Sequence, residues 1–250
     1  MTNKPSAGAG RTALVFLSLI LSSASHADGT KAFVARPKLG SATLELPASI
    51  TWQARANAQG LHVVTLNALI DLTSTLKNIK SLSAKALDRA PPCGDAVKIL
   101  NAAAKLTGAT TLRYDLRFRF VRRVCAGTLP LELPADVDCA ARIALLAARS
   151  IITVDVRGAA NPPCRIVGAY QLVSDAVYSM VGVDVFQKHM IDLSKQLPPE
   201  FRGVTINIRS LAFDLPPAPA RLRVSGESIM SKAQYAEFTA RLDAVAPSTH

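Results

Sequence analysis

The chain has 250 residues, of which 49% are hydrophobic and 19% charged, and its formal net charge is +11 at pH 7. A chain of this size can bury roughly 70% of its unfolded surface, so it does not depend on disulfides or metals to fold. The basic balance favours anionic partners such as lipid headgroups, acidic glycans or nucleic acid, although it also serves general solubility.

The N-terminal segment is typical of a secretory signal peptide. Two basic residues precede the apolar stretch 12–21, and small residues precede a cleavage position after Ala27. The apolar stretch is shorter than the roughly 20 residues that a membrane-spanning helix needs. No cysteine lies near the cleavage position, and no later segment is a long uncharged apolar run. We therefore expect a signal peptide over residues 1–27 and one secreted or periplasmic domain over residues 28–250.

The first strand signals follow the cleavage position. Residues 50–56 alternate between apolar and polar, and Asn57 to Gly60 reads as a turn. Residues 64–76 then carry apolar side chains on one parity, which predicts a long strand, although the same leucines also fit a helix. The Thr, Asn and Asp content favours the strand. The apolar candidates for a core or a ligand-lining face here are Val64, Leu66, Ile70 and Leu72.

A hairpin is predicted around Ala109. The stretch 96–106 precedes the turn "TGA" and reads as a strand, with a helix as the alternative because of its alanines. The stretch after the turn alternates strictly. Its apolar side, a second candidate core or ligand-lining face, is Leu112, Tyr114, Leu116, Phe118 and Phe120. Its other residues include a candidate basic surface of Arg113, Arg117, Arg119, Arg122 and Arg123, partly neutralised by Asp115.

Four cysteines follow the predicted signal peptide, namely Cys93, Cys125, Cys139 and Cys164. An even number in an oxidising compartment predicts two disulfides. Cys93 and Cys125 are equally distant from Ala109, so the hairpin favours a Cys93–Cys125 bond and leaves Cys139–Cys164. If the first arm were helical, Cys125–Cys139 and Cys93–Cys164 would compete. No CxxC spacing and no neighbouring histidine support zinc.

The rest of the chain mixes strands with two helical signals. Residues 152–156 alternate, and a change of parity near Ser210 predicts a bulge in a strand over residues 204–215. Residues 173–197 carry two apolar stripes that predict a long helical segment broken near Gly182. A capping box at Ser231 to Gln234 predicts a C-terminal helix.

These elements predict an α+β fold. We expect a long, strongly twisted antiparallel sheet wrapped around or packed on a long helical segment, with a C-terminal helix. The pattern of residues 64–76, 112–120, 172–197 and 204–215 resembles the tubular lipid-binding superfamily, whose bacterial members include periplasmic proteins. The resemblance is one of pattern and carries no residue set; it implies binding of a lipid or another elongated apolar molecule along the inner face.

No catalytic motif supports an enzyme. Ser74 to Lys77 matches SxxK, but in a strand these two side chains point to opposite faces, and the partner motifs are missing. No cofactor or metal site is indicated. The leading hypothesis is a non-enzymatic carrier for a lipid-like ligand; the alternatives are an assembly protein of the cell envelope and a hydrolase with a site built from distant residues. An anionic membrane surface is a candidate partner. Nucleic acid is disfavoured because the aromatic residues alternate away from the arginines, and the sequence does not define the oligomeric state.

Overall fold

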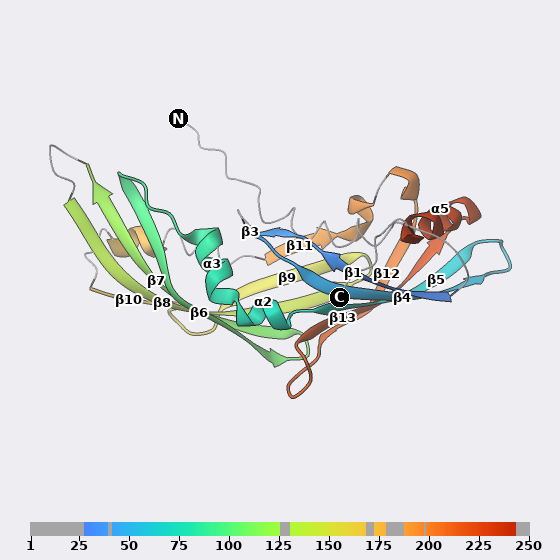
Figure 1. The fold of residues 1–250 in the computed structure, drawn as a ribbon, viewed down its shortest axis with the longest axis horizontal. Coiled ribbons are helices and arrows are strands. Elements are labelled where there is room, and N and C mark those ends of the chain that lie inside the picture. Colours follow the sequence, from blue (N-terminus) through green and yellow to red (C-terminus); the bar gives the residue numbers. More distant parts are fainter. Residues whose placement is uncertain are drawn as a thin grey trace.

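The computed structural model describes most of the chain between residues 28 and 243. The described ranges are 28–39, 42–125, 131–168, 173–178, 188–197 and 199–243. The predicted signal peptide, residues 1–27, lies outside them. The molecule is elongated and curved, with antiparallel sheets along its outer side and helices on the inner side (Figure 1).

Five strands form one half of the molecule, which we call sheet 1. Their order across the sheet is β1-β4-β5-β13-β12, and every neighbouring pair is antiparallel. Because β5 pairs with β4 on one side and β13 on the other, the sheet joins the two ends of the described chain. The strands are β1 (Asp28–Ala35), β4 (Leu46–Ala56), β5 (His62–Asp71), β12 (Thr205–Phe213) and β13 (Arg221–Met230).

The other half is sheet 2, with the order β11-β9-β8-β7-β6. The second half of β8 pairs with β9, and the short β10 pairs with the first half of β8 along the same edge. Long alternating segments form this sheet because one face of each strand is buried. The strands are β6 (Gly94–Gly108), β7 (Thr111–Val124), β8 (Leu131–Ala148), β9 (Ile151–Gly158), β10 (Cys164–Val167) and β11 (Lys188–Asp192).

The remaining elements are short. A small ribbon pairs β2 with β3, and residues 173–178 are helical. The other bounds are β2 (Lys38–Leu39), β3 (Ala42–Thr43), α2 (Thr73–Lys77), α3 (Ile79–Leu87), the 3₁₀ helices η1 (Leu193–Gln196) and η2 (Pro199–Phe201), and α5 (Lys232–Asp243).

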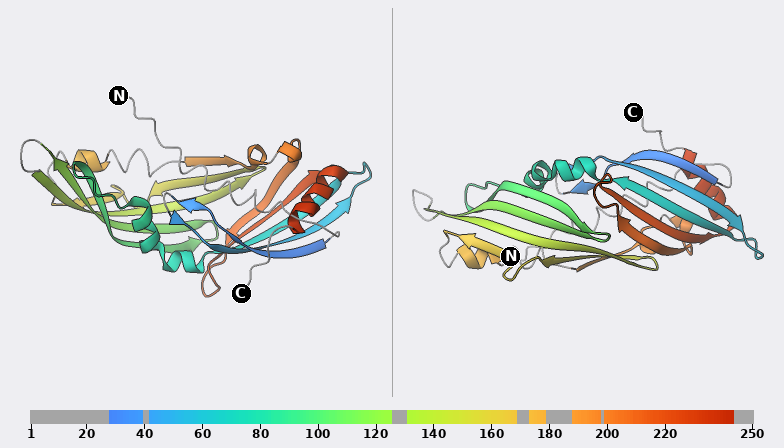
Figure 2. Two further views of the ribbon diagram at one scale, coloured as in Figure 1. Left: turned by 45° about the horizontal axis from the view of Figure 1, so that its top comes forward. Right: turned by 90° about the horizontal axis from the view of Figure 1, so that it is seen from below.

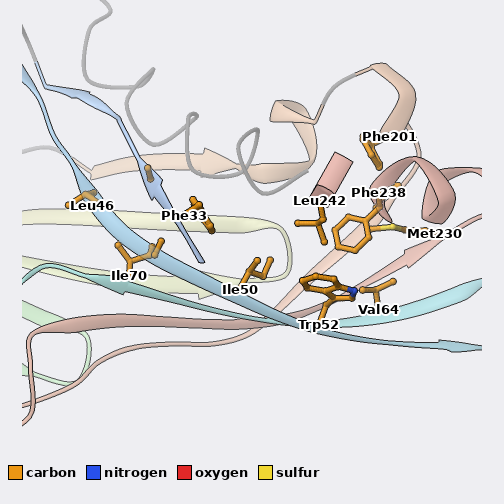
Figure 3. Packing of buried hydrophobic residues seen from close by; sticks show 13 residues of the cluster. Phe33, Leu46, Ile50, Trp52, Val64, Ile70, Phe201, Met230, Phe238 and Leu242 are labelled. Carbon is orange, nitrogen blue, oxygen red and sulfur yellow. The ribbon is translucent and has the colours of Figure 1, made fainter. Parts of the chain in front are cut away.

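Each sheet has its own hydrophobic core on its inner face. In the first, Phe238 and Leu242 of α5 and Phe201 of η2 pack over Trp52 and Val64 (Figure 3). The rings of Trp52 and Phe238 meet edge to face, with centroids 6.3 Å apart. Burying a side chain of this size stabilises the fold by about 1.5–3 kcal/mol.

The second core lies between sheet 2, α3 and the helical residues 173–178. Phe118 and Phe120 of β7 are 2% and 0% exposed. Val173 and Val177, on one side of the short helix, pack against the same cluster, as do Ile79 and Ala84 from the α3 side. The two cores lie on one side of the molecule, and the two longest of the described helices, α3 and α5, pack against them there (Figure 2).

The two sheets meet along β12. The carbonyl of Ala109, in the turn between β6 and β7, accepts a hydrogen bond from the backbone N–H of Phe213. The carbonyl of Arg149, between β8 and β9, accepts one from Ile208 at 2.8 Å. The tips of two sheet 2 hairpins therefore occupy the free edge of β12, which would otherwise be an exposed edge strand.

Several local predictions are confirmed. Residues 96–106 lie in a strand, and the predicted bulge lies between Ile208 and Ser210. Ser231 caps α5: its Oγ accepts from the Gln234 backbone N–H at 3.2 Å, and the Gln234 Oε1 accepts from the Ser231 N–H at 2.9 Å. The sheet-dominated α+β class and the C-terminal helix are confirmed as well.

Three predictions need correction. Two large sheets, beside the small β2–β3 ribbon, replace the single expected sheet. The strand predicted over residues 64–76 ends at Asp71, and α2 begins at Thr73. The Asp71 Oδ1 accepts the Thr73 backbone N–H at 2.8 Å, and this local bond turns the chain away from the sheet.

The long helical segment predicted over residues 173–197 is also wrong. Helix is present at residues 173–178, but Lys188–Asp192 is strand β11, paired with β9, and η1 follows it. Met190, expected on an apolar helix stripe, is 71% exposed on β11. Pairing with a strand distant in sequence decided the conformation of this short segment. The predicted break at Gly182 lies outside the described residues.

Candidate apolar binding groove

An apolar groove lies on the inner face of sheet 1. Its floor comes from β4, β5, β13 and β12, and its roof comes from the segment between β11 and β12. The cavity within the groove measures about 90 Å³ and is partly open. The apolar side chains that line it are Ile50, Leu66, Ala68, Leu193, Leu197, Phe201, Val204, Ile206, Ile208, Val224 and Met230.

Small residues keep the centre of the groove open. Ala68 lies directly between Ile50 and Val224 across three strands, so the middle of the row has one methyl group. Gly226 follows on β13, and a Cβ at this position would lie 2.8 Å from the carbonyl oxygen of Asn207. Glycine therefore allows β12 to approach β13 closely beside the bulge.

One buried polar group faces this apolar surface. Ser228 of β13 is 2% exposed and lines the groove. Its Oγ has no hydrogen-bond partner among the described residues. A buried hydroxyl without a partner costs about 1–3 kcal/mol, so a ligand oxygen or a water molecule in the groove would remove that penalty.

The apolar surface continues beyond the groove onto the middle of sheet 2. There the inner-facing side chains of β7, β8, β9 and β11 are half-buried and belong to neither core cluster. Leu193, in the roof of the groove, directly follows β11, which carries Ile191 of this surface, so the two surfaces adjoin. We call this surface the inner band; its members are Leu112, Ile143, Leu145, Ile152, Val154 and Ile191.

The apolar candidates from the sequence divide between these surfaces and the cores. Leu66 lines the groove and Leu112 lies in the inner band. The other candidates on sheet 1 are buried in or against the first core: Val64, Ile70 and Leu72. Those on β7 belong to the second: Tyr114, Leu116, Phe118 and Phe120. The roof residues of the groove were missed, because only pairing of β11 with β9 brings that segment over the sheet.

The five candidate arginines do not form a free cationic surface. Arg117 and Arg119 pair with Asp136, Arg117 also reaches Asp138, and the Arg119 guanidinium lowers the pKa of the Asp136 carboxyl. The remaining pairs are Arg113 with Asp115, Arg122 with Asp95 and Arg123 with Glu132. Each of the five arginines therefore has a carboxylate partner, whereas the sequence had indicated only Asp115.

The SxxK residues lie in a helix rather than in the predicted strand, so their side chains are not placed on opposite faces of a sheet. The partner motifs are still missing from the sequence. Ser74 and Lys77 are both exposed in α2. The Ser74 Oγ accepts a hydrogen bond from the Asn78 side-chain amide at 3.3 Å. This arrangement lacks the buried pocket in which such a serine acts.

Both predicted disulfides form. Cys93 bonds Cys125 across the ends of β6 and β7, and Cys139 of β8 bonds Cys164 of β10. Two disulfides are consistent with an oxidising compartment outside the cytoplasm. Within the described ranges, no group of three or more His, Cys, Asp or Glu side chains is placed to hold a metal ion.

The described helices include none with the length and apolar character needed to cross a bilayer. No protein-family model matches the chain, no curated protein matches its sequence, and no solved structure matches its fold.

Proposed function

We propose that this protein is an exported, non-enzymatic carrier of a lipid or another elongated apolar ligand. The observation that supports this proposal is the groove, in which apolar side chains surround an open space and one buried hydroxyl. Binding sites for small molecules are typically apolar concavities with a few placed polar groups. The Ser228 hydroxyl would bind an oxygen of the ligand.

The size of the cavity indicates how such a ligand would lie. Its volume of about 90 Å³ is smaller than the roughly 150 Å³ of an apolar cavity that binds benzene. The enclosed part would therefore take one short stretch of an alkyl chain. The rest of the ligand would lie along the inner band, which is already half-exposed and apolar.

The lining residues do not favour a hydrolase. A catalytic serine needs a base within hydrogen-bond reach. The carboxylate nearest in sequence, Glu227, is bound to Arg209 at 2.5 Å, and the Ser228 Oγ has no hydrogen-bond partner in the part of the chain described. Export by the predicted signal peptide and the resemblance to tubular lipid-binding proteins belong to the same proposal, which the curved sheets and the inner apolar surfaces support.

Narrowing the groove tests the proposal. The mature protein would be purified from the periplasm or medium of an expressing cell and examined by native mass spectrometry, with extraction of any bound lipid. Ala68→Trp places a large ring in the groove. Asn67→Trp, one residue away, places the same ring on the outer face of β5 and is the matched control.

We expect a bound lipid-like mass on the wild type and on Asn67→Trp, and its loss from Ala68→Trp. Ser228→Val, which removes the hydroxyl with little change in volume, should weaken binding without closing the groove. Circular dichroism and a urea titration would confirm that each variant is folded. Equal lipid occupancy in all variants, or no lipid on any of them together with a stably bound protein, would favour the alternative of an envelope assembly protein.

A further inference from the structure

A row of four cations crosses the outer face of sheet 2. Lys105 of β6 lies opposite Arg113 of β7, Arg113 opposite Arg142 of β8, and Arg142 opposite Arg157 of β9. All four side chains are exposed. We call these residues the cation row. Three of the four junctions between neighbouring strands thus bring like charges to Cβ separations of roughly 4.5–5.5 Å.

The carboxylates beside the cation row neutralise half of it. Arg113 pairs with Asp115 and Arg157 with Asp155, each within its own strand. Lys105 and Arg142 have no ion pair within the described ranges. Farther along the same face Arg117 lies opposite Asp138. Lys98 also lies opposite Arg119 there, but each of these two cations has its own carboxylate partner, Asp88 and Asp136.

This contrast indicates an external anionic partner. Directly opposed like charges on a sheet are destabilising, and the same strands carry opposed arginine–carboxylate pairs farther along. An anionic surface over the row would replace repulsion between the side chains with attraction to the partner. The outer face is open to such contact, because the side chains of the row are exposed and no described helix covers these strands in the view from below (Figure 2).

Exposed apolar side chains lie on the same face, four residues along the strands from the row. Leu146 of β8 and Met190 of β11 flank Thr153 of β9 in one cross-strand row, and Ile151 follows. Their exposed fractions are 54% for Leu146, 71% for Met190 and 37% for Ile151. Four strand residues span about 13 Å. We call Leu146, Ile151 and Met190 the outer apolar patch.

A cation row beside an exposed apolar patch is better suited to a membrane than to the other anionic partners. Exposed apolar residues next to Lys and Arg are typical of proteins that lie on a bilayer interface. Single-stranded nucleic acid is bound through aromatic side chains on which bases stack. The outward positions of β6, β7, β8, β9 and β11 carry no Phe, Tyr or Trp.

We propose that the outer face of sheet 2 docks on an anionic phospholipid membrane. The cation row binds lipid phosphates, and the outer apolar patch inserts at the level of the headgroups. This surface is on the opposite face of sheet 2 from the inner band, so docking leaves the proposed ligand path open. The docking proposal does not depend on the groove.

Vesicle co-sedimentation of the mature protein tests the cation row. The probes are vesicles of phosphatidylcholine alone and of phosphatidylcholine with phosphatidylglycerol in equal parts. We expect binding to the anionic vesicles and its loss in about 1 M salt, where the screening length falls to about 3 Å. Lys105→Gln combined with Arg142→Gln should weaken binding about 30-fold, from roughly 1 kcal/mol per charge near the surface and 1.4 kcal/mol per tenfold.

Matched controls remove the same number of charges or apolar groups elsewhere. Lys80→Gln with Lys232→Gln removes two exposed cations from α3 and α5 and should leave vesicle binding unchanged. Leu146→Ser with Met190→Ser should weaken binding to anionic vesicles about tenfold. The control pair Leu87→Ser with Leu215→Ser alters two exposed leucines off this face. It should leave binding to anionic vesicles unchanged.

Three results would overturn the proposal: equal binding to neutral and anionic vesicles, equal loss from the target and control pairs, and binding of heparin or duplex DNA without binding of vesicles. Lipid occupancy, measured separately by native mass spectrometry, is expected to be unchanged in the Lys105/Arg142 variant. If the protein failed to bind vesicles but kept its normal lipid occupancy, the docking proposal would be wrong and the proposed carrier function would be unaffected.

Discussion

The hydroxyl of Tyr114 on β7 lies 2.8 Å from the Oγ of Ser83 on α3. Ser83 is 4% exposed, and its hydroxyl also donates to the Ile79 carbonyl oxygen at 2.6 Å. The single proton of Ser83 is thereby used, so Tyr114 is the donor between the two hydroxyls. Burial raises the pKa of the Tyr114 hydroxyl, which keeps its proton in place. This bond joins α3 to the inner face of sheet 2.

Tyr114→Phe should lower the free energy of unfolding by about 1 kcal/mol. The ring stays packed, but one hydrogen bond is lost. Ser83→Ala should cost a similar amount, and the double variant should cost less than the sum of the two, because both single changes break the same bond. Urea titrations of the four proteins measure this coupling. Strictly additive losses would show that the two hydroxyls do not interact in solution.

Adjacent residues on β7 should differ sharply in their effect on stability. Phe118 is 2% exposed in the second core, whereas the Arg117 side chain is 55% exposed on the outer face. Phe118→Ala should cost about 3–5 kcal/mol, because it leaves a cavity. Arg117→Ala should change the free energy of unfolding by about 0.5 kcal/mol or less. Comparable losses in urea titrations would contradict the assignment of inner and outer faces.

Asp95 should contribute to acid sensitivity through Arg122. The two side chains form two hydrogen bonds, of 2.8 and 2.9 Å, between directly opposed positions of β6 and β7. The guanidinium lowers the pKa of the Asp95 carboxyl, and burial partly opposes this. A carboxyl whose pKa is lower in the folded state stabilises the fold above its unfolded pKa of about 3.9. That contribution is lost as the pH falls through the folded pKa.

Asp95→Asn should therefore cost about 1 kcal/mol at pH 7, a modest amount because both side chains are partly exposed. The difference from the wild type should shrink as the pH falls below about 4. Arg122→Gln should give the same profile, since it removes the other half of the pair. Urea titrations at several pH values measure it; a difference from the wild type that stays constant down to pH about 2 would be the contrary result.

The sequence predicted features that are determined locally or by strict alternation. The hairpin around Ala109, both disulfides, the bulge near Ser210 and the Ser231 cap all depend on neighbouring residues or on equal spacing from a turn. The end of β5 was missed because Leu72 and Leu76 fit a strand and a helix equally well. In that segment the Asp71–Thr73 bond decided between the two.

Features that depend on pairing between distant segments were not predicted. Strand β11 carries apolar residues at helical spacing, and only its partner β9 makes it a strand. The groove roof depends on that same pairing. The cation row could not be predicted for a related reason. Its four members lie on four different strands, and only the registers of three strand pairs align them.

The cation row should itself reduce stability, which can be tested without any ligand. Arg142 lies between Arg113 and Arg157, so Arg142→Gln removes two repulsive contacts and should raise the free energy of unfolding by a few tenths of a kcal/mol. Arg119 on the same face lies opposite Asp136 and binds it at 2.8 Å. On its other side Arg119 lies opposite Lys98, whose charge is neutralised by Asp88. Arg119→Gln makes the same chemical change but chiefly removes the attraction to Asp136, so it should lower stability.

The two variants should therefore shift the urea midpoint in opposite directions at low salt. Both shifts should diminish in about 1 M salt, where charges on an exposed face are screened. Far-UV circular dichroism would establish that neither variant alters the sheets. If Arg142→Gln instead destabilises the protein as Arg119→Gln does, Arg142 has a stabilising partner in solution, and the repulsion from which the anionic docking surface is inferred does not exist.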